Sequence, residues 1–319
     1  MNAVISLDLD RVHLPDGLIL RDTELAAAVG GDTLSIKKCR TTYGESVIDA
    51  KGDLEFLRSQ PAAPYVLFAD VSIADFDVGQ FLKQTAPDQE PALEALVNLR
   101  AELSSQAALP EELFDAIAGD VSISAKQGIF RALRRGAVSD VIETVSLLGQ
   151  LGGMLTGQQD VEAVAQLTTY FNAIAFDNLE IVARRNADLS IDVLNFLLSN
   201  PDLMLAGQGS IGNQPNREFY EQPIELLLNI GTKPPVRHLF ERLKLLEMFA
   251  EDEEAPGADE YWNLRRKVEL RGSITKPDPS EFWKRILEAG ARRLIDRQRE
   301  EGESSRDATI REIRGVLGF

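Results

Sequence analysis

The chain has 319 residues, of which 51 are acidic and 34 are basic, and its net charge at pH 7 is −17. This charge argues against nucleic-acid binding, which needs a basic stripe, and against broad attraction to anionic lipid head groups. Cys39 is the only cysteine, so a scaffold built on intrachain disulfides is excluded. No run of about 18 apolar residues occurs, so we expect no membrane span and no signal peptide in this chain. We therefore expect either a cytoplasmic protein or a portion of a larger one.

The first 136 residues are predicted to form short strands joined by tight turns. Pro-Asp-Gly at residues 15–17 and Gly-Gly-Asp at residues 30–32 are typical turn sequences. We expect strands at residues 4–14, 18–21, 24–29, 34–36, 47–54, 65–73, 93–103 and 121–125, and short helices at residues 78–83 and 110–119. Strands at such regular spacing favour an antiparallel meander over β-α-β winding.

The strand predicted at residues 93–103 has the clearest pattern. Apolar residues occupy every second position: Leu93, Ala95, Val97, Leu99, Ala101 and Leu103. Polar residues occupy four of the five positions between them: Glu94, Asn98, Arg100 and Glu102. Because side chains of a strand alternate between its two faces, this segment is expected to have one dry face and one wet face.

The second half of the chain mixes helices with further strands. Helices are expected at residues 139–155 and 161–171, from Pro234-Pro235 onward, after Ser280 and at residues 310–317. Strands are expected at residues 176–184, 188–192, 203–211, 224–230 and 264–274. We therefore divide the chain into an N-terminal part of the sheet (1–136), a helical insertion (137–175), a C-terminal part of the sheet with one amphipathic helix (176–279) and a helical tail (280–319).

A nucleotide site is not supported by the glycine-rich run at residues 207–212. Its letters match G-x-G-x-x-G, but that site needs a helix beginning there, so that backbone amides hold the pyrophosphate. Asn213-Gln214-Pro215 follows instead, which predicts a strand end with turn glycines.

The remaining candidates for catalysis are isolated. His13 and His238 are the only histidines and have no metal-ligand spacing to a cysteine or to each other. Cys39 is expected beyond the end of the strand at 34–36, without an activating neighbour. The carboxylate pairs Asp8/Asp10 and Asp75/Asp77 occupy polar positions of alternating strands, where acids are ordinary. The sequence therefore predicts no enzyme, no catalytic residue, no metal and no cofactor.

Three segments together resemble the AsmA-like family. Residues 110–130 resemble its helix, glycine and strand run, residues 200–211 its "P-x-L-x-L-x-G-x-G-x-I" strand, and residues 268–279 its closing strand with a proline-rich exit. Residues 18–54 resemble its upstream repeat, so the resemblance spans most of residues 18–279. It implies a periplasmic protein of Gram-negative bacteria, anchored in the inner membrane by an N-terminal segment absent from this chain. It also implies a role in envelope lipid homeostasis and outer-membrane biogenesis, like bridge-like lipid carriers.

The fold expected from these patterns is α+β, with a predominantly antiparallel and strongly curled sheet. The sheet would form a half-open apolar groove with capping helices and would shield a phospholipid or another acyl lipid. The predicted lining is Leu93, Ala95, Val97, Leu99, Ala101, Leu103, Val121, Ile123, Ala125, Ile224, Leu226, Leu228, Ile230, Val268, Leu270 and Ile274. Two alternatives stay open: helices that fill this face as a plain core, and an envelope scaffold that binds a protein partner through its sheet edge or the helix at 139–155.

Overall fold

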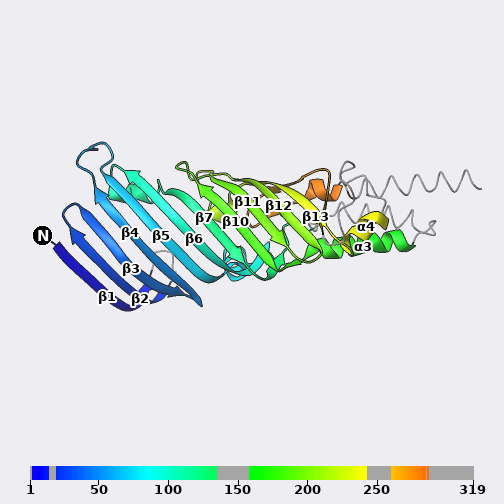
Figure 1. Ribbon diagram of the computed structural model, residues 1–319, viewed down its shortest axis with the longest axis horizontal. Coiled ribbons are helices and arrows are strands. Elements are labelled where there is room, and N and C mark those ends of the chain that lie inside the picture. Colours follow the sequence, from blue (N-terminus) through cyan, green and yellow to red (C-terminus); the bar gives the residue numbers. More distant parts are fainter. Residues whose placement is uncertain (1, 14–18, 135–157, 243–259, 285, 287–319) are drawn as a thin grey trace, which may run out of the picture.

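The computed structural model describes residues 2–13, 19–134, 158–242, 260–284 and 286, and antiparallel strands dominate it (Figure 1). The strands are β1 (Asn2–His13), β2 (Ile19–Gly30), β3 (Thr33–Tyr43), β4 (Ser46–Phe56), β5 (Tyr65–Asp77), β6 (Leu93–Ala107), β7 (Ala118–Ala125), β8 (Gly128–Phe130), β9 (Ile174–Phe176), β10 (Asn178–Arg185), β11 (Ile191–Ser199), β12 (Leu203–Ile211), β13 (Ile224–Thr232), β14 (Trp262–Asn263), β15 (Val268–Gly272) and β16 (Pro277–Asp278). The helices are α1 (Val78–Thr85), η1 (Pro110–Leu113), α3 (Gln158–Asn172), η2 (Phe219–Glu221) and α4 (Val236–Arg242). Among the described residues, no helix has the length and apolar character needed to cross a membrane.

All these strands belong to one 16-stranded sheet whose order nearly follows the chain. The path runs β1-β2-β3-β4-β5-β6-β7-β10-β11-β12-β13-β15-β16, with β8, β9 and β14 attached beside it. The predicted antiparallel α+β fold is therefore confirmed. The sheet is neither closed nor strongly curled, so the expected strong curl is wrong. Closure into a barrel would require the first and last strands to pair, and β1 and β16 lie at opposite ends of the path.

The predicted alternation at residues 93–103 is confirmed, and the structure extends it into the 15-residue strand β6. Val97, Ala101, Ser105 and Ala107 of β6 are buried, whereas Leu96, Asn98, Arg100 and Glu102 on the other parity are exposed. The neighbours of β6 continue this pattern, because directly opposed residues of antiparallel strands share a face. The whole sheet thus has one apolar and one polar face.

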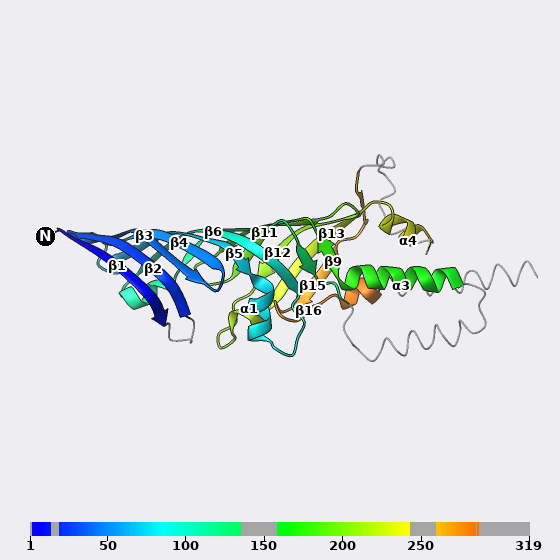
Figure 2. The same cartoon turned by 90° about the horizontal axis from the view of Figure 1, so that it is seen from below.

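Helices and the main core occupy only part of the apolar face. Phe171 of α3, Phe240 of α4, and Phe282 and Trp283 of the helical segment at 280–284 are buried in one aromatic cluster. The core beneath them is formed mainly by β9 to β15. In Figure 2, α3 and α1 lie on the same side of the sheet, and α3 lies beyond the strands of the C-terminal half.

β-bulges interrupt the pairing at several places along the sheet. Ile36 pairs with Gly52 and Cys39 with Ala50, so Lys37 and Lys38 together oppose Lys51. Further register shifts occur in β2, in β5 and between β10, β11 and β12. An extra residue bends a strand and increases its local twist, so the bulges shape the sheet without closing it.

Several predicted element boundaries need correction. Residues 19–21 and 24–29 belong to one strand, β2, while residue 18 lies outside the described residues. Residues 37–43 extend the predicted strand at 34–36 into β3, so Cys39 lies inside a strand. The predicted helix at 110–119 is only the 3-10 turn η1, because Ala118 and Gly119 already pair with Ser104 and Leu103 of β6. The strand predicted at 264–274 is shorter, as β15. The predicted helix at 161–171 is confirmed by α3, whereas those at 139–155 and 310–317 lie outside the described residues.

The strand predicted at residues 188–192 is a turn followed by a longer strand. The Asp188 carboxylate accepts hydrogen bonds from the backbone N–H and the hydroxyl of Ser190, at 3.0 and 2.6 Å. Leu189 between them has a φ of 67°. Side-chain capping of this kind favours a turn over an extended strand, and β11 therefore begins only at Ile191.

Candidate functional site

The candidate site is the apolar face of β1 to β6, here called the open face. Its residues belong to four rows that cross the strands in register. The two central rows are Leu7-Leu25-Cys39-Ala50-Val71-Ala101 and Ile5-Ala27-Ile36-Gly52-Ala69-Leu103; the flanking rows are Leu9-Thr23-Thr41-Ile48-Ile73-Leu99 and Val29-Leu34-Leu54-Leu67-Ser105. Thr23 and Thr41 lie at a register shift and are joined by a hydrogen bond between their hydroxyls at 2.8 Å. No residue of these rows carries a formal charge at pH 7.

The open face is less covered than an ordinary core. Ile5, Leu7 and Leu9 of β1 are 40%, 44% and 41% exposed, and Val29 of β2 and Phe56 of β4 are each 38% exposed. Most of the remaining large apolar side chains in the rows are half-buried. An exposed and contiguous apolar surface of this kind marks a binding site or an interface more often than a chance feature.

Small residues concentrate in the central rows. Ala50, Ala69 and Ala101, together with Gly52, lie between flanking rows that carry Ile48 and other branched side chains. The same two rows also carry larger residues, namely Ile5, Leu7, Leu25, Ile36, Val71 and Leu103. We call the two central rows together the lane, which runs across the strands. Five interstrand spacings of about 4.8 Å separate β1 from β6, so the lane is about 24 Å long.

The lane has borders at β6. On one side Leu82 of α1 is 7% exposed and Val97 of β6 is 2% exposed. On the other, the buried hydroxyl of Ser105 donates to the backbone oxygen of Leu113 in η1 at 2.7 Å. Figure 2 shows that α1 lies on the same side of the sheet as the core helix α3.

From β6 onward, the residues of the predicted lining are buried or half-buried. Val97, Ala101 and Ala125 of the predicted lining are buried, and Leu93, Ala95, Leu99, Leu103, Val121 and Ile123 are half-buried. Ile224, Leu228, Ile230, Val268 and Leu270 are at most 7% exposed and belong to the main core, while Leu226 and Ile274 pack against it. The assignment of these sixteen residues to a lipid groove stays a prediction.

Sequence reasoning placed no site residue on β1 to β5, where the face is most exposed. The signal was present, because Ile5, Leu7 and Leu9 alternate with Ser6 and Asp8. The same alternation runs through residues 65–73. Alternation alone cannot distinguish a covered face from an open one, since every second residue of the strand is apolar in both cases.

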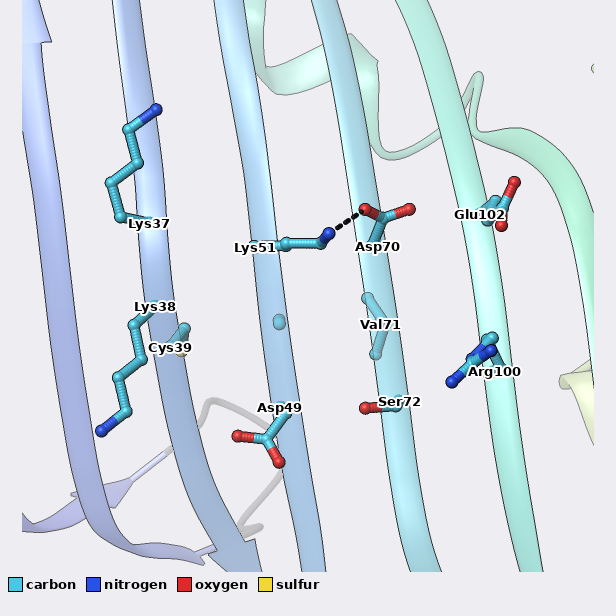
Figure 3. Close-up of a pocket in the computed structure, with 11 residues that line it drawn as sticks. Lys37, Lys38, Cys39, Asp49, Lys51, Asp70, Val71, Ser72, Arg100 and Glu102 are labelled. Carbon is cyan, nitrogen blue, oxygen red and sulfur yellow. Dashed lines mark ion pairs between the residues drawn. The ribbon is translucent and has the colours of Figure 1, made fainter.

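The opposite face carries ladders of charge. Lys51 lies 3.0 Å from Asp70 on the neighbouring strand, and Arg184 lies 2.7 Å from Asp120. Figure 3 shows the Lys51–Asp70 pair within a shallow depression of about 480 Å³, beside Lys37, Lys38 and Arg100. Ion pairs at such exposed positions contribute about 0–1 kcal/mol each. This face is therefore a solvated surface, in contrast to the uncharged rows of the open face.

Two groups have pKa values that reflect the two faces. The hydrogen bonds and charge of Arg184 hold the pKa of Asp120 below its usual range, and both side chains are more than half exposed on the polar face. Burial raises the pKa of the Cys39 thiol on the open face, and the carboxylate of Asp49 adds to the shift. Cys39 thus has the character of an unreactive thiol in apolar surroundings.

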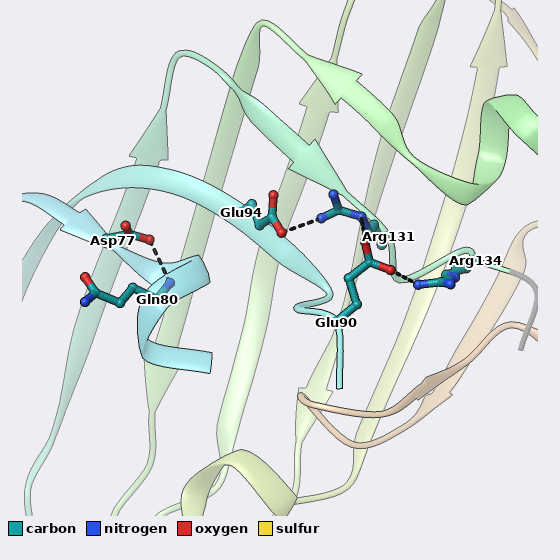
Figure 4. A network of polar contacts seen from close by, with 6 residues as sticks. All are labelled: Asp77, Gln80, Glu90, Glu94, Arg131 and Arg134. Carbon is teal, nitrogen blue, oxygen red and sulfur yellow. Dashed lines mark hydrogen bonds and ion pairs between the residues drawn. The ribbon is translucent and has the colours of Figure 1, made fainter. Parts of the chain in front are cut away.

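A polar network fixes the start of β6, where β8 pairs with it (Figure 4). The Arg131 guanidinium lies 3.2 Å from the Glu90 carboxylate and 3.0 Å from that of Glu94. Arg134 pairs with the same Glu90. The side chain of Arg131 is only 12% exposed, and its Nη1 forms an ion pair with Glu94 without hydrogen-bond geometry. The network is structural, since it ties the segment after α1 to the end of β8.

The candidates for catalysis stay apart from one another. His13 is exposed at the end of β1, and the His238 ring lies 2.8 Å from Glu241 on α4. Asp77 accepts a hydrogen bond from the backbone N–H of Gln80 and so caps α1. Within the described ranges, no cluster of three or more His, Cys, Asp or Glu residues could hold a metal ion.

The glycine-rich run at residues 207–212 also has a structural explanation. The expected strand end is confirmed, because β12 ends at Ile211, but Gly207 and Gly209 are not turn glycines. Gly207 and Gly209 lie inside β12, opposite Leu228 and Leu226 of β13. A Cβ atom at Gly209 would lie 2.0 Å from the backbone oxygen of Glu225. These glycines therefore allow close approach of β13 rather than a nucleotide.

The chain matches no protein-family model, no curated protein and no solved structure. The resemblance to the AsmA-like family thus stays a prediction, and the function has to be argued from the open face itself.

Proposed function

We propose that this chain is a non-enzymatic lipid-binding or lipid-transfer module, and that the open face is a groove for the acyl chains of a phospholipid or another acyl lipid. The observation that carries the proposal is the set of uncharged rows on β1 to β6. The β1 residues of these rows, Ile5, Leu7 and Leu9, are 40–44% exposed. Together with the resemblance, it favours a periplasmic module of an inner-membrane-anchored AsmA-like protein that contributes to outer-membrane lipid homeostasis.

The energetics of lipid transfer require such a surface. A phospholipid that leaves a bilayer exposes roughly thirty methylenes, at about 0.8 kcal/mol each, so the penalty is on the order of 20 kcal/mol. An apolar lane offsets this penalty in proportion to the area that it covers. The strand ladder meets the hydrogen-bonding needs of its own backbone, so the lane presents few unsatisfied polar groups to the chain.

The dimensions of the lane suit an acyl chain. The lane runs about 24 Å across six strands, while one leaflet contributes about 15 Å of the bilayer's hydrocarbon thickness. An extended acyl chain therefore fits along the lane between β1 and the borders at β6. The lane is shallow, because its walls are single side chains.

The open edge of β1 favours a second candidate, a scaffold that binds an envelope protein by strand pairing. β1 exposes Val4 at 84% and has no neighbour on its outer side among the described residues. Exposed edges of this kind recruit strands from partners. This candidate predicts a stoichiometric protein partner and an empty open face.

Native mass spectrometry of protein purified from membranes, followed by lipid extraction, distinguishes the two candidates. The parent should carry lipid, and Ala50→Trp should lose most of it, because an indole in the central row fills the lane. Ala26→Trp is the matched control, since Ala26 pairs with Ser6 and Lys38 on the polar face. Circular dichroism should show that both variants are folded. Absence of lipid from the parent, or equal lipid in both variants, would overturn the lipid proposal.

A further inference from the structure

The two ends of the sheet differ in how their edges are protected. At one end, the last strand β16 has two residues, and one of them is Pro277. A short edge strand with proline resists further pairing. At the other end, β1 has twelve residues and pairs with β2 without a register shift. It contains no proline and no lysine, and its charged side chains, Asp8, Asp10 and Arg11, lie in its second half.

β1 is also apolar at its exposed positions. Val4 is 84% exposed, and Ile5, Leu7 and Leu9 are 40–44% exposed. These side chains lie beside a row of free backbone N–H and C=O groups, because only one edge of β1 is paired within the described part of the chain. A strand with these properties is a template for another strand.

We propose that β1 pairs antiparallel with β1 of a second copy, with Leu7 directly opposite the partner's Leu7. The sequence is self-complementary in this register. Ile5 opposes the partner's Leu9 on the apolar face, and Ser6 and Val4 oppose the partner's Asp8 and Asp10 on the polar face. No like charges meet, and residues 2–12 all find partners. A two-fold axis through Leu7 closes the assembly at two copies.

Other registers are less favourable. A register centred on Asp8 or on Leu9 places carboxylates opposite carboxylates, which destabilises a pair of strands. A register centred on Ser6 pairs only residues 2–10. Sliding one strand by a single residue along the other would place apolar residues opposite polar ones, so neither face of the joined sheet would stay apolar or polar throughout. The Leu7 register therefore combines the longest ladder with matched faces.

The pairing would join the open faces of two copies, and this consequence rests on the proposed function. The central rows end at β1 in each copy, while their other ends meet the core beyond β6. The Leu7 row would then continue across twelve strands and eleven spacings, or about 53 Å, while the Ile5 row of each copy would meet the Leu9 row of the other. The joined face would be open along its length and bordered by packed core at both ends.

A cysteine placed at the symmetry axis tests the register. In a Cys39→Ser background, Leu7→Cys should form an intermolecular disulfide when diamide accepts the two electrons and two protons of the thiols. Opposed Cβ atoms lie about 4.5–5.5 Å apart, close to the separation in disulfides. Ala3→Cys is the matched control, because the two Ala3 positions would lie about 27 Å apart along the ladder. Cross-linking at Ala3→Cys but not at Leu7→Cys would overturn the register.

Sedimentation analysis of the delipidated full chain tests the pairing itself. The parent should sediment with twice the mass of one 35.2 kDa chain. Leu7→Lys should return it to one chain by placing two lysines opposite each other. Val29→Lys should stay dimeric, since Val29 is similarly exposed on the same face but lies one strand away from the edge. A monomeric parent at the highest soluble concentration overturns the inference even if it binds lipid. A dimer without lipid upholds it and overturns the proposed function instead.

Discussion

The indole N–H of Trp283 donates a hydrogen bond to the backbone oxygen of Leu133 at 2.8 Å, across 150 positions of the chain. Leu133 is fully buried and Trp283 is 4% exposed. This bond joins the residues after β8 to the helical segment at 280–284, and so helps to fix the packed end of the apolar face.

Trp283→Phe should therefore destabilise the fold by about 1–3 kcal/mol, because it leaves a buried carbonyl without its donor. Chemical denaturation followed by circular dichroism measures this change. The control is Phe219→Leu, which alters a side chain that is 54% exposed and should change the unfolding free energy by less than about 0.5 kcal/mol. Equal stability of Trp283→Phe and the parent would show that the bond contributes nothing.

Arg131→Met should lower the unfolding free energy by about 1–2 kcal/mol, because it leaves the carboxylates of Glu90 and Glu94 without their shared cation. The cost stays below that of a fully buried pair, since these glutamates are 48% and 40% exposed. Arg134→Met is the control at a side chain that is 49% exposed and should cost less. A larger loss for Arg134→Met than for Arg131→Met in denaturant titrations would contradict this order.

The sequence predicted the antiparallel sheet because its longest strand alternates without interruption. In β6 each second side chain from Leu93 to Ala107 faces the apolar side, and its pairing with β5 is one-to-one from Leu99 to Ala107. Where a bulge occurs, prediction failed. Lys37 and Lys38 face the same side in β3, so the alternation ends after Ile36 in the sequence and the predicted strand stopped there.

The open face could be predicted only in part. Alternation identifies which parity is apolar, and the register of β5 with β6 places Tyr65, Leu67 and Val71 on the same face as Ala107, Ser105 and Ala101. Exposure depends on which helices reach the face, and that is a matter of tertiary packing. The pairing of Ala50 with Cys39 and Val71 likewise depends on contacts between separate strands, which single-strand patterns do not encode.

Gly209→Ala should cost about 3 kcal/mol, because the new Cβ would lie 2.0 Å from the backbone oxygen of Glu225 and must push β13 away. Gly31→Ala is the comparison. Gly31 has a φ of 61° but open space around it, so only backbone strain of about 1 kcal/mol is expected. Denaturation midpoints should follow this order. A more stable Gly209→Ala would indicate that β12 and β13 separate easily.

Cys39 should report occupancy of the open face through its rate of alkylation. It lies in a central row between Leu25 and Ala50, and burial raises the pKa of its thiol. Because the thiolate is the reactive form, a raised pKa leaves less of it at pH 7, and iodoacetamide should react more slowly than with free cysteine. The rate should increase with pH until the thiol is ionised.

Bound lipid should slow this reaction further, because an acyl chain in the lane covers the sulfur. Mass spectrometry of the alkylated chain, before and after removal of lipid, measures the effect over a range of pH. Ala50→Trp controls for coverage without lipid, since its indole should protect Cys39 in both samples. If the parent reacts at the same rate with and without lipid at every pH, acyl chains do not lie over the central rows, and the open face is not the lipid site.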